Sequence, residues 1–157
     1  YQSLLGREKV PIEWFGFVGA GSNLGASLLL MAAPKIRKTM GENPALFLSS
    51  LLPGLLYMAS GFFAGLGITL LAIFGVTMLK LFRAPLLAAS MNTFLENEHR
   101  ATALSGISMV ERVLIALLYP IVGAVADSSL EASLIGLGIL TVFMSFAVRM
   151  RNEPKRS

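Results

Sequence analysis

The stretch GLGITLLAIFGVTMLKLFRAPLLAASMN, from Gly65 to Asn92, is a long apolar run that carries only two charged residues. A helix rises 1.5 Å per residue, so roughly 20 apolar residues cross the hydrocarbon core of a bilayer, which is about 30 Å thick. Lipid offers no hydrogen-bond partners to the backbone, so such a segment must pair its own amide and carbonyl groups as a helix. We therefore expect this stretch to cross a membrane.

Four further stretches of the chain have a similar length and composition. The sequence predicts five membrane-spanning helices, near residues 12–34, 45–64, 66–91, 103–126 and 130–148. Residues 1–11 would form the end of a preceding helix and an extracytoplasmic loop, and residues 149–157 a basic cytoplasmic tail. The predicted fold class is all-α, a polytopic helical membrane protein. Because the chain starts at Tyr1 and YQSLL is typical of a helix end, we expect a fragment of a longer protein.

The composition excludes several classes of function. Of the 157 residues, 55% are hydrophobic and only 14% are charged, whereas about a quarter of a soluble domain is charged. The net charge of +4 does not form a basic patch with interleaved aromatic residues, so we expect no nucleic-acid partner. The chain has no cysteine, which excludes disulfides and thiolate metal sites. With no histidine in a span and no acid–base set, we expect neither an enzyme nor a bound metal or cofactor.

Basic residues gather in alternate connections between the predicted spans. They are Lys35, Arg37 and Lys38 after the first span, Arg100 after the third, and Arg149, Arg151, Lys155 and Arg156 in the tail. Cytoplasmic loops are enriched in lysine and arginine, so these connections and the C-terminus are predicted to face the cytoplasm. Arg7 and Lys9 lie on the opposite side in this arrangement and are its one exception.

Three prolines, Pro53, Pro85 and Pro120, fall inside predicted spans. Each removes a helical hydrogen bond and is expected to kink or break its helix. Interrupted spans are common where transporters bind substrate. Membrane helices also tolerate proline without such a role, so both interpretations stay open.

Glycines four residues apart predict close helix packing. These pairs are Gly21 with Gly25 and Gly61 with Gly65, and small residues at this spacing let neighbouring helices approach each other. The first pair belongs to GAGSNLG, which is similar to a dinucleotide-binding fingerprint. Its last spacing is one residue too long, and it lies in a predicted span rather than after a strand. We expect helix packing there and no nucleotide.

Charged residues inside two neighbouring spans are the main candidates for function. Lys80 and Arg83 are three residues apart and share one helical face, and the next span contains Glu111 and Arg112. A charge at the bilayer centre costs at least ~2.5–3.5 kcal/mol, so these side chains should face protein or a water-filled cavity. We expect an ion pair between Arg83 and Glu111, with Lys80 and Arg112 closer to a cavity. Such a pair would either hold two helices together or line a transport path.

Other polar residues give weaker indications. Asn23 in the first span would make an interhelical hydrogen bond or bind substrate. Asp127 has the appearance of a coupling carboxylate, but the spacing from Ser128 to Glu131 is that of a capping box, which favours the start of the last helix. His99 lies in the predicted cytoplasmic loop, where we expect a solvated side chain.

The segment LFRAPLLAASMNTFLENEHRATALSGISMVERVLIALLYPIVGAVAD, from Leu81 to Asp127, resembles the tenth and eleventh helices of bacterial transporters of the major facilitator superfamily. The similar features are an Arg-x-Pro in the tenth helix, an asparagine before the loop, Arg-Ala-Thr opening the eleventh helix, and a closing Pro-xx-Gly-xxx-Asp. On this basis the five spans are the eighth to twelfth helices of that family. The loop AAPKIRKTMGENP departs from the family pattern because it lacks the usual aspartate, so a gating role for that aspartate is not expected here.

The resemblance implies the C-terminal half of a secondary active transporter that works by alternating access. Its partners would be the lipid bilayer, a missing N-terminal half, a small-molecule solute and a coupling proton or ion. The candidates for the substrate pathway or its gating are Asn23, Lys80, Arg83, Glu111 and Arg112, with Arg100 in the cytoplasmic loop. The basic side chains suggest an anionic or zwitterionic solute. The location implied is a bacterial inner membrane, with the C-terminus in the cytoplasm.

One alternative from another functional class remains open. The chain could be a free-standing membrane scaffold that assembles through its glycine spacings without moving a solute. A membrane-embedded enzyme is the least favoured class, for the reasons of composition given above.

Overall fold

The computed structural model describes the backbone of residues 1–94 and 100–152, and the side chains of residues 1–41, 43–87, 102 and 105–149. The described chain is helical: α1 (Gln2–Arg7), α2 (Glu13–Met40), α3 (Glu42–Phe62), α4 (Leu66–Phe94), α5 (Arg100–Ser128) and α6 (Leu130–Asn152). Helices α2 to α6 are each long and apolar enough to cross a membrane. The prediction of an all-α fold with five such helices is confirmed, and the chain is that of an integral membrane protein.

Helix α2 extends further than the sequence pattern predicted. Pro34 lies inside the helix, and the bases that follow it, Lys35 to Lys38, belong to its last turns rather than to a loop. A proline removes one helical hydrogen bond and its ring crowds the preceding turn, but the turns beyond it can still form. The helix ends at Gly41, where φ is +84° and the amide donates to the Arg37 carbonyl at 2.9 Å. Glycine adopts this positive φ without a steric cost.

The three prolines of the later spans also lie inside continuous helices. Pro53 is in α3, Pro85 in α4 and Pro120 in α5. The helix continues on both sides of each residue, so the prolines do not break their spans, and the expectation of a kink stays a prediction. Each costs one backbone hydrogen bond, and the neighbouring bonds hold the helix together.

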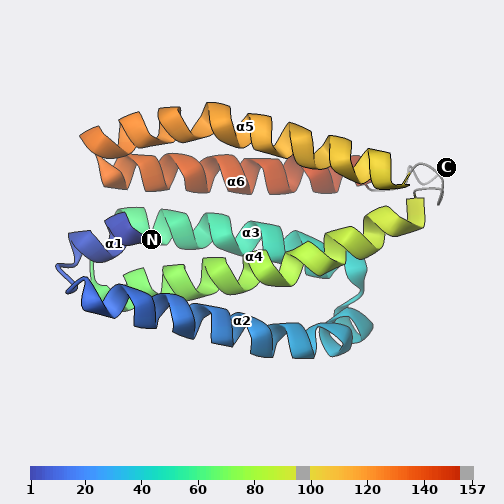
Figure 1. Cartoon of the computed structure of the whole chain (residues 1–157), viewed down its shortest axis with the longest axis horizontal. Coiled ribbons are helices and arrows are strands. Elements are labelled where there is room, and N and C mark those ends of the chain that lie inside the picture. Colours follow the sequence, from blue (N-terminus) through green and yellow to red (C-terminus); the bar gives the residue numbers. More distant parts are fainter. Residues whose placement is uncertain (95–99, 153–157) are drawn as a thin grey trace.

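Contacts between the helices follow an order different from that of the chain. Helix α3 packs most extensively against α6, α4 packs against both α3 and α2, and α5 has its main contact with α6 (Figure 1). Helices α4 and α5 are consecutive in the sequence but make little contact through the residues that the structure describes. Figure 1 shows α5 and α6 as one layer beside α2, α3 and α4. Over its described residues, α5 therefore contacts the bundle mainly through the side that faces α6.

Backbone contact between small residues explains why α3 and α6 pack so closely. A Cβ atom added to Gly138 would lie 2.7 Å from the carbonyl oxygen of Gly54, and one added to Gly61 would lie 3.0 Å from the carbonyl oxygen of Glu131. Residue numbers rise along α3 as they fall along α6, so the two helices are antiparallel. Only glycine permits this separation, which brings two helices of membrane-spanning length into extensive contact.

The glycines predicted to pack lie in two different settings. Added Cβ atoms at Gly21 and Gly25 would lie 3.1 Å from Phe74 and 3.2 Å from the Met78 sulfur, so both glycines face α4. Gly61 faces α6, as described above. Gly65 differs, because it lies in the turn before α4 with a φ of +145° and no atom within 4 Å of an added Cβ. Glycine is needed at this position because of the backbone conformation of the turn and not because of helix packing.

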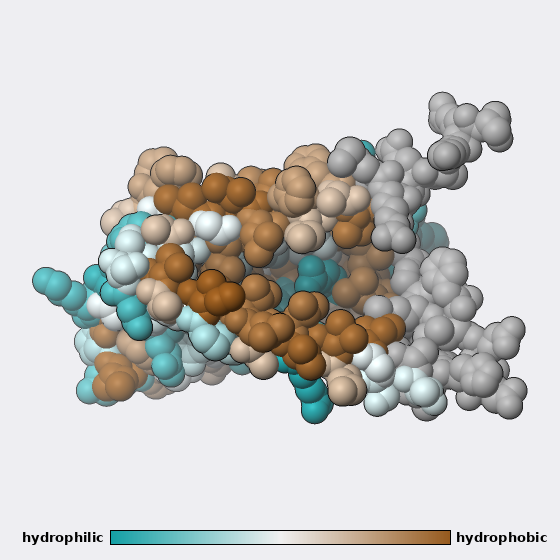
Figure 2. Space-filling view, turned by 90° about the horizontal axis from the view of Figure 1, so that it is seen from above, coloured by the Kyte–Doolittle hydropathy of each residue, from teal (hydrophilic) through white to brown (hydrophobic). Residues whose placement is uncertain are grey.

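The outer surface of the bundle is largely apolar. In α5, none of the residues in the membrane-spanning segment Ser105–Ser128 is buried, and α2 exposes Phe17, Leu24 and Met31. Figure 2 shows mainly hydrophobic side chains on one such face, with a hydrophilic patch near its middle. Apolar side chains facing outward are expected where the surroundings are acyl chains, so the surface agrees with a membrane location.

Candidate functional site

Arg83 lies between α3 and α4 and is half-buried. Its Nη1 donates a hydrogen bond to the Ser50 hydroxyl at 3.3 Å, and that hydroxyl donates to the Leu46 carbonyl at 2.9 Å. Helix α3 therefore supplies a polar group for the guanidinium at a depth where lipid offers none. The acceptor is a neutral hydroxyl, so no carboxylate among the described side chains pairs with the positive charge of Arg83.

The predicted ion pair between Arg83 and Glu111 does not form. Among the residues whose side chains are described, Glu111 makes no ion pair and is exposed on α5. The prediction assumed that consecutive antiparallel helices pack side by side. Helix α5 instead packs on α6, and its contact with α4 is minimal. The carboxylate is thus separated from the guanidinium by the arrangement of the helices.

Among the exposed charged side chains in membrane-spanning segments, Lys80, Glu111 and Arg112 lie at least six residues from either end of their segments. Lys80 belongs to the span Leu66–Leu87, and Glu111 and Arg112 belong to the span Ser105–Ser128. Within the described part of the chain, none of the three forms an ion pair. Acyl chains cannot solvate these charges. The surface that carries them therefore needs water, a solute or another polypeptide beside it.

Asn23 is exposed and bonded to its own helix. Its Nδ2 donates to the Gly19 carbonyl at 3.0 Å, so it makes neither the expected interhelical bond nor a contact with the charged residues. Arg100 begins α5, but its side chain lies outside the described residues, as does the whole of His99. Among the described residues, the five pathway candidates make no hydrogen bond or ion pair with one another.

The cap of α6 is one residue later than the sequence spacing indicated. Ser129, not Ser128, accepts a hydrogen bond from the Ala132 amide at 3.2 Å, and its hydroxyl donates to Glu131 Oε2 at 3.3 Å. Ser128 instead donates to the Val125 carbonyl of α5. This segment starts the last helix as expected, with Ser129 as the residue that satisfies the free amide.

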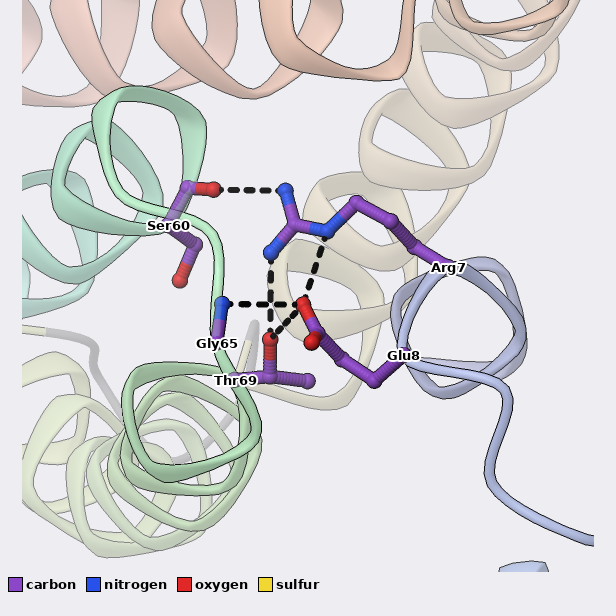
Figure 3. A network of polar contacts seen from close by, with 5 residues as sticks. All are labelled: Arg7, Glu8, Ser60, Gly65 and Thr69. Atoms are coloured by element: carbon purple, nitrogen blue, oxygen red, sulfur yellow. Dashed lines mark hydrogen bonds and ion pairs between the residues drawn. The ribbon is translucent and has the colours of Figure 1, made fainter.

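A polar cluster that the sequence did not predict joins α1 to the turn between α3 and α4 (Figure 3). Arg7 donates from Nη1 to the Ser60 carbonyl at 2.8 Å, from Nη2 to the Thr69 hydroxyl at 3.1 Å, and from Nε to Glu8 at 3.1 Å. The Glu8 Oε1 atom also accepts from the Gly65 amide at 3.1 Å and from the Thr69 hydroxyl at 3.2 Å. Arg7 and Glu8 thus connect α1 to the end of α3 and to the start of α4.

The hydrogen bonds to Glu8 stabilise its charged form. The Gly65 amide, followed by the Arg7 and Thr69 side chains, holds the pKa of Glu8 below its usual value of 4.5, although burial acts in the opposite direction. The Ser60 hydroxyl in the same cluster is fully buried and has no hydrogen-bond partner among the described residues. Glu8 thus neutralises the charge of Arg7 within the cluster.

The cluster has no arrangement suited to metal chemistry. The described residues contain no group of three or more histidine, aspartate or glutamate side chains that could hold a metal ion. A guanidinium already occupies the position beside Glu8, and its charge would repel a cation. The geometry is that of a structural tie between helices.

No protein-family model, curated protein or solved structure matches this chain. A functional assignment therefore depends on the residues and contacts described above.

Proposed function

We propose that this chain is the C-terminal half of a secondary active transporter, of the major facilitator type, that moves a small solute by alternating access. The observation that carries the proposal is the exposure of Lys80, Glu111 and Arg112 within membrane-spanning segments. Each central charge costs at least ~2.5–3.5 kcal/mol in lipid. A water-filled path between two halves of a transporter removes this cost, which a plain membrane anchor could not do.

The signs of the charges suggest the class of solute. Lys80, Arg83 and Arg112 are basic, and Glu111 is the one acidic residue among these candidates. A solute with a carboxylate or phosphate group would complement the bases, and a zwitterion would complement both signs. The proposed partners are therefore an anionic or zwitterionic solute, a coupling proton or ion, and an N-terminal half that forms the other wall.

The location follows from the distribution of charge. Lys35, Arg37 and Lys38 end α2, and Arg149 lies near the end of α6. Because helices with even labels run in the same direction, these bases belong to the same side of the bundle, which the enrichment of bases in cytoplasmic segments assigns to the cytoplasm. We propose on this basis that the C-terminus is cytoplasmic, and the resemblance to bacterial transporters of the major facilitator superfamily is the ground for proposing a bacterial inner membrane.

A transport assay on the complete protein in proteoliposomes tests this function. We expect the K80Q/R83Q variant to take up or release anionic and zwitterionic solutes at least about tenfold more slowly, a loss of about 1.4 kcal/mol of transition-state stabilisation. The control is K9Q, which removes an exposed base outside the spans. Transport by K80Q/R83Q at the rate of K9Q would contradict the proposal.

The scaffold remains the second candidate because α5 has most of its surface without a partner. Its other support is weaker than the sequence suggested, since Gly21, Gly25 and Gly61 face helices of the same chain. A scaffold would form a stable homo-oligomer through α5 and would show no solute flux. Measuring the mass of the purified protein in detergent, together with the transport assay, distinguishes the two.

A further inference from the structure

Helix α1 packs on the bundle through an apolar cluster. Leu4 and Leu5 are buried together with Ile73 of α4 and Leu134 of α6, and Tyr57 of α3 packs against them. Figure 1 shows α1 at the end of the bundle where α3 ends and α4 begins. We call these five residues the α1 core cluster. Three membrane-spanning helices therefore each direct one face toward α1.

The same three faces carry polar side chains further along the bundle. A residue seven positions from another lies on the same helical face, about 10 Å along the axis. Because α3 is antiparallel to α4 and α6, steps of seven away from α1 lead in one direction on all three helices. The residues reached are Ser50 from Tyr57, Lys80 from Ile73 and Thr141 from Leu134. Three helices thus place a polar residue at a similar depth, beyond the part that α1 covers.

Arg83 belongs to this polar group. It follows Lys80 by three residues, and its Nη1 donates to the Ser50 hydroxyl at 3.3 Å. That hydroxyl gives its own proton to the Leu46 carbonyl at 2.9 Å, so it can only accept from the guanidinium. Among the described residues, Nε and Nη2 of Arg83 make no hydrogen bond. Ser50 therefore orients the guanidinium and leaves free the edge that can bind a carboxylate or phosphate through two parallel bonds.

The charges around Arg83 favour an anion. Residues 43–87, which form the spans of α3 and α4, contain no aspartate or glutamate. The Thr141 hydroxyl donates to the Leu137 carbonyl, so it offers only lone pairs to its surroundings. Glu111 belongs to α5, which makes little contact with α4 through the described residues. An anion would satisfy Lys80 and Arg83, whereas the ammonium group of a zwitterion would meet no carboxylate on these two helices.

We propose that Lys80 and Arg83 bind the carboxylate or phosphate group of an anionic solute, and that Ser50 is the residue that positions Arg83. The free edge of the guanidinium holds two oxygens of the anion, and Lys80 supplies the second positive charge. This inference rests on the proposed transport function. It narrows the solute from an anion or a zwitterion to an anion.

Binding can be measured without transport. A bound anion raises the unfolding temperature of the complete protein in detergent as the anion concentration rises, which gives an apparent affinity. The probes are succinate, inorganic phosphate and, as a zwitterion, β-alanine. S50A removes the acceptor for Arg83, and S50T keeps it. The matched control is S49A, because Ser49 also donates to the Leu46 carbonyl but makes no hydrogen bond with Arg83.

We expect succinate or phosphate to bind the unmodified protein, and β-alanine to bind much more weakly. S50A should weaken binding of the anion about fivefold, whereas S49A and S50T should stay close to the unmodified protein. K80Q should weaken it at least about tenfold, and its exposed position keeps this test valid if S50A fails to fold. Binding of neither anion, equal binding of β-alanine, or equal affinities of S50A and S49A would overturn the proposal.

Transport by the same variants in proteoliposomes separates this inference from the proposed function. S50A should raise the KM for the bound anion about fivefold and leave kcat unchanged, because the hydrogen bond to Arg83 orients the binding group. Anion binding that depends on Ser50, in a protein that moves no solute, would contradict the proposed function and support the site. Anion transport with the same KM in S50A and S49A would support the function and contradict the role of Ser50.

Discussion

Gly54 of α3 and Gly138 of α6 lie in backbone contact, so that a methyl group on Gly138 would be 2.7 Å from the Gly54 carbonyl oxygen. This contact lies within the most extensive interface of the bundle. The same interface continues at one end to an edge-to-face contact between Phe47 and Phe146, whose ring centres are 5.4 Å apart. It is also the main connection between the layer of α5 and α6 and the rest of the molecule.

Replacing Gly138 by alanine should therefore destabilise the protein. The added methyl group collides with backbone and with Met58, and overpacking of this kind costs roughly 1–3 kcal/mol. The matched control is G136A on the same helix, where an added Cβ has no atom within 4 Å. Unfolding in a detergent series should show a loss for G138A and no loss for G136A. Equal stability of the two variants would contradict the tight α3–α6 contact.

The Arg7 cluster predicts that Thr69 stabilises the end of the bundle. Thr69 is fully buried, accepts a hydrogen bond from Arg7 and donates one to Glu8. Valine has a similar shape but no hydroxyl, so T69V should lower the free energy of unfolding by roughly 1–3 kcal/mol. A double-mutant cycle with R7M measures the coupling between the two residues. Additive effects of the two substitutions would show that they do not interact.

A low pH should weaken the hydrogen bonds and the ion pair that Glu8 makes in the Arg7 cluster. Because the pKa of Glu8 is lowered in the folded protein, its contribution to stability is present above its usual pKa of 4.5 and is lost as the pH falls through the lower, folded value. The quantity to measure is the difference in unfolding temperature between the wild type and E8Q, since the other carboxylates titrate in both. This difference should be largest near neutral pH and shrink below pH 4.5. A difference that stays constant across this range would contradict the role given to the Glu8 charge.

The membrane-spanning helices could be predicted from the sequence because bilayer thickness fixes their length and their composition. Their ends were harder to place, since Pro34 did not stop α2 and Gly41 did. The packing order could not be deduced from the chain order. The α3–α6 interface keeps α5 away from α4. It depends on the contact between Gly54 and Gly138, and these two residues are far apart in the sequence.

The candidate site was predicted in part. Lys80, Glu111 and Arg112 were identified because a charge inside an apolar span is costly, but the pairing of Arg83 required knowledge of which helices touch. The Arg7 cluster was missed because adjacent residues on a helix do not face each other. Glu8 lies just beyond the end of α1, where the chain turns and its carboxylate can reach Arg7. The signal that could have indicated this cluster is a base and an acid next to each other at a helix end, close to an apolar segment.

The charged face of α5, which carries Glu111, is expected to meet water or polar groups and not acyl chains. The chain has no cysteine, so single cysteines can be introduced as E111C and as V113C, about 200° away around the helix. The measurement is the rate at which a charged, membrane-impermeant thiol reagent labels each variant of the complete protein in proteoliposomes. We expect rapid labelling of E111C and little labelling of V113C. Protection of E111C to the level of V113C would contradict it.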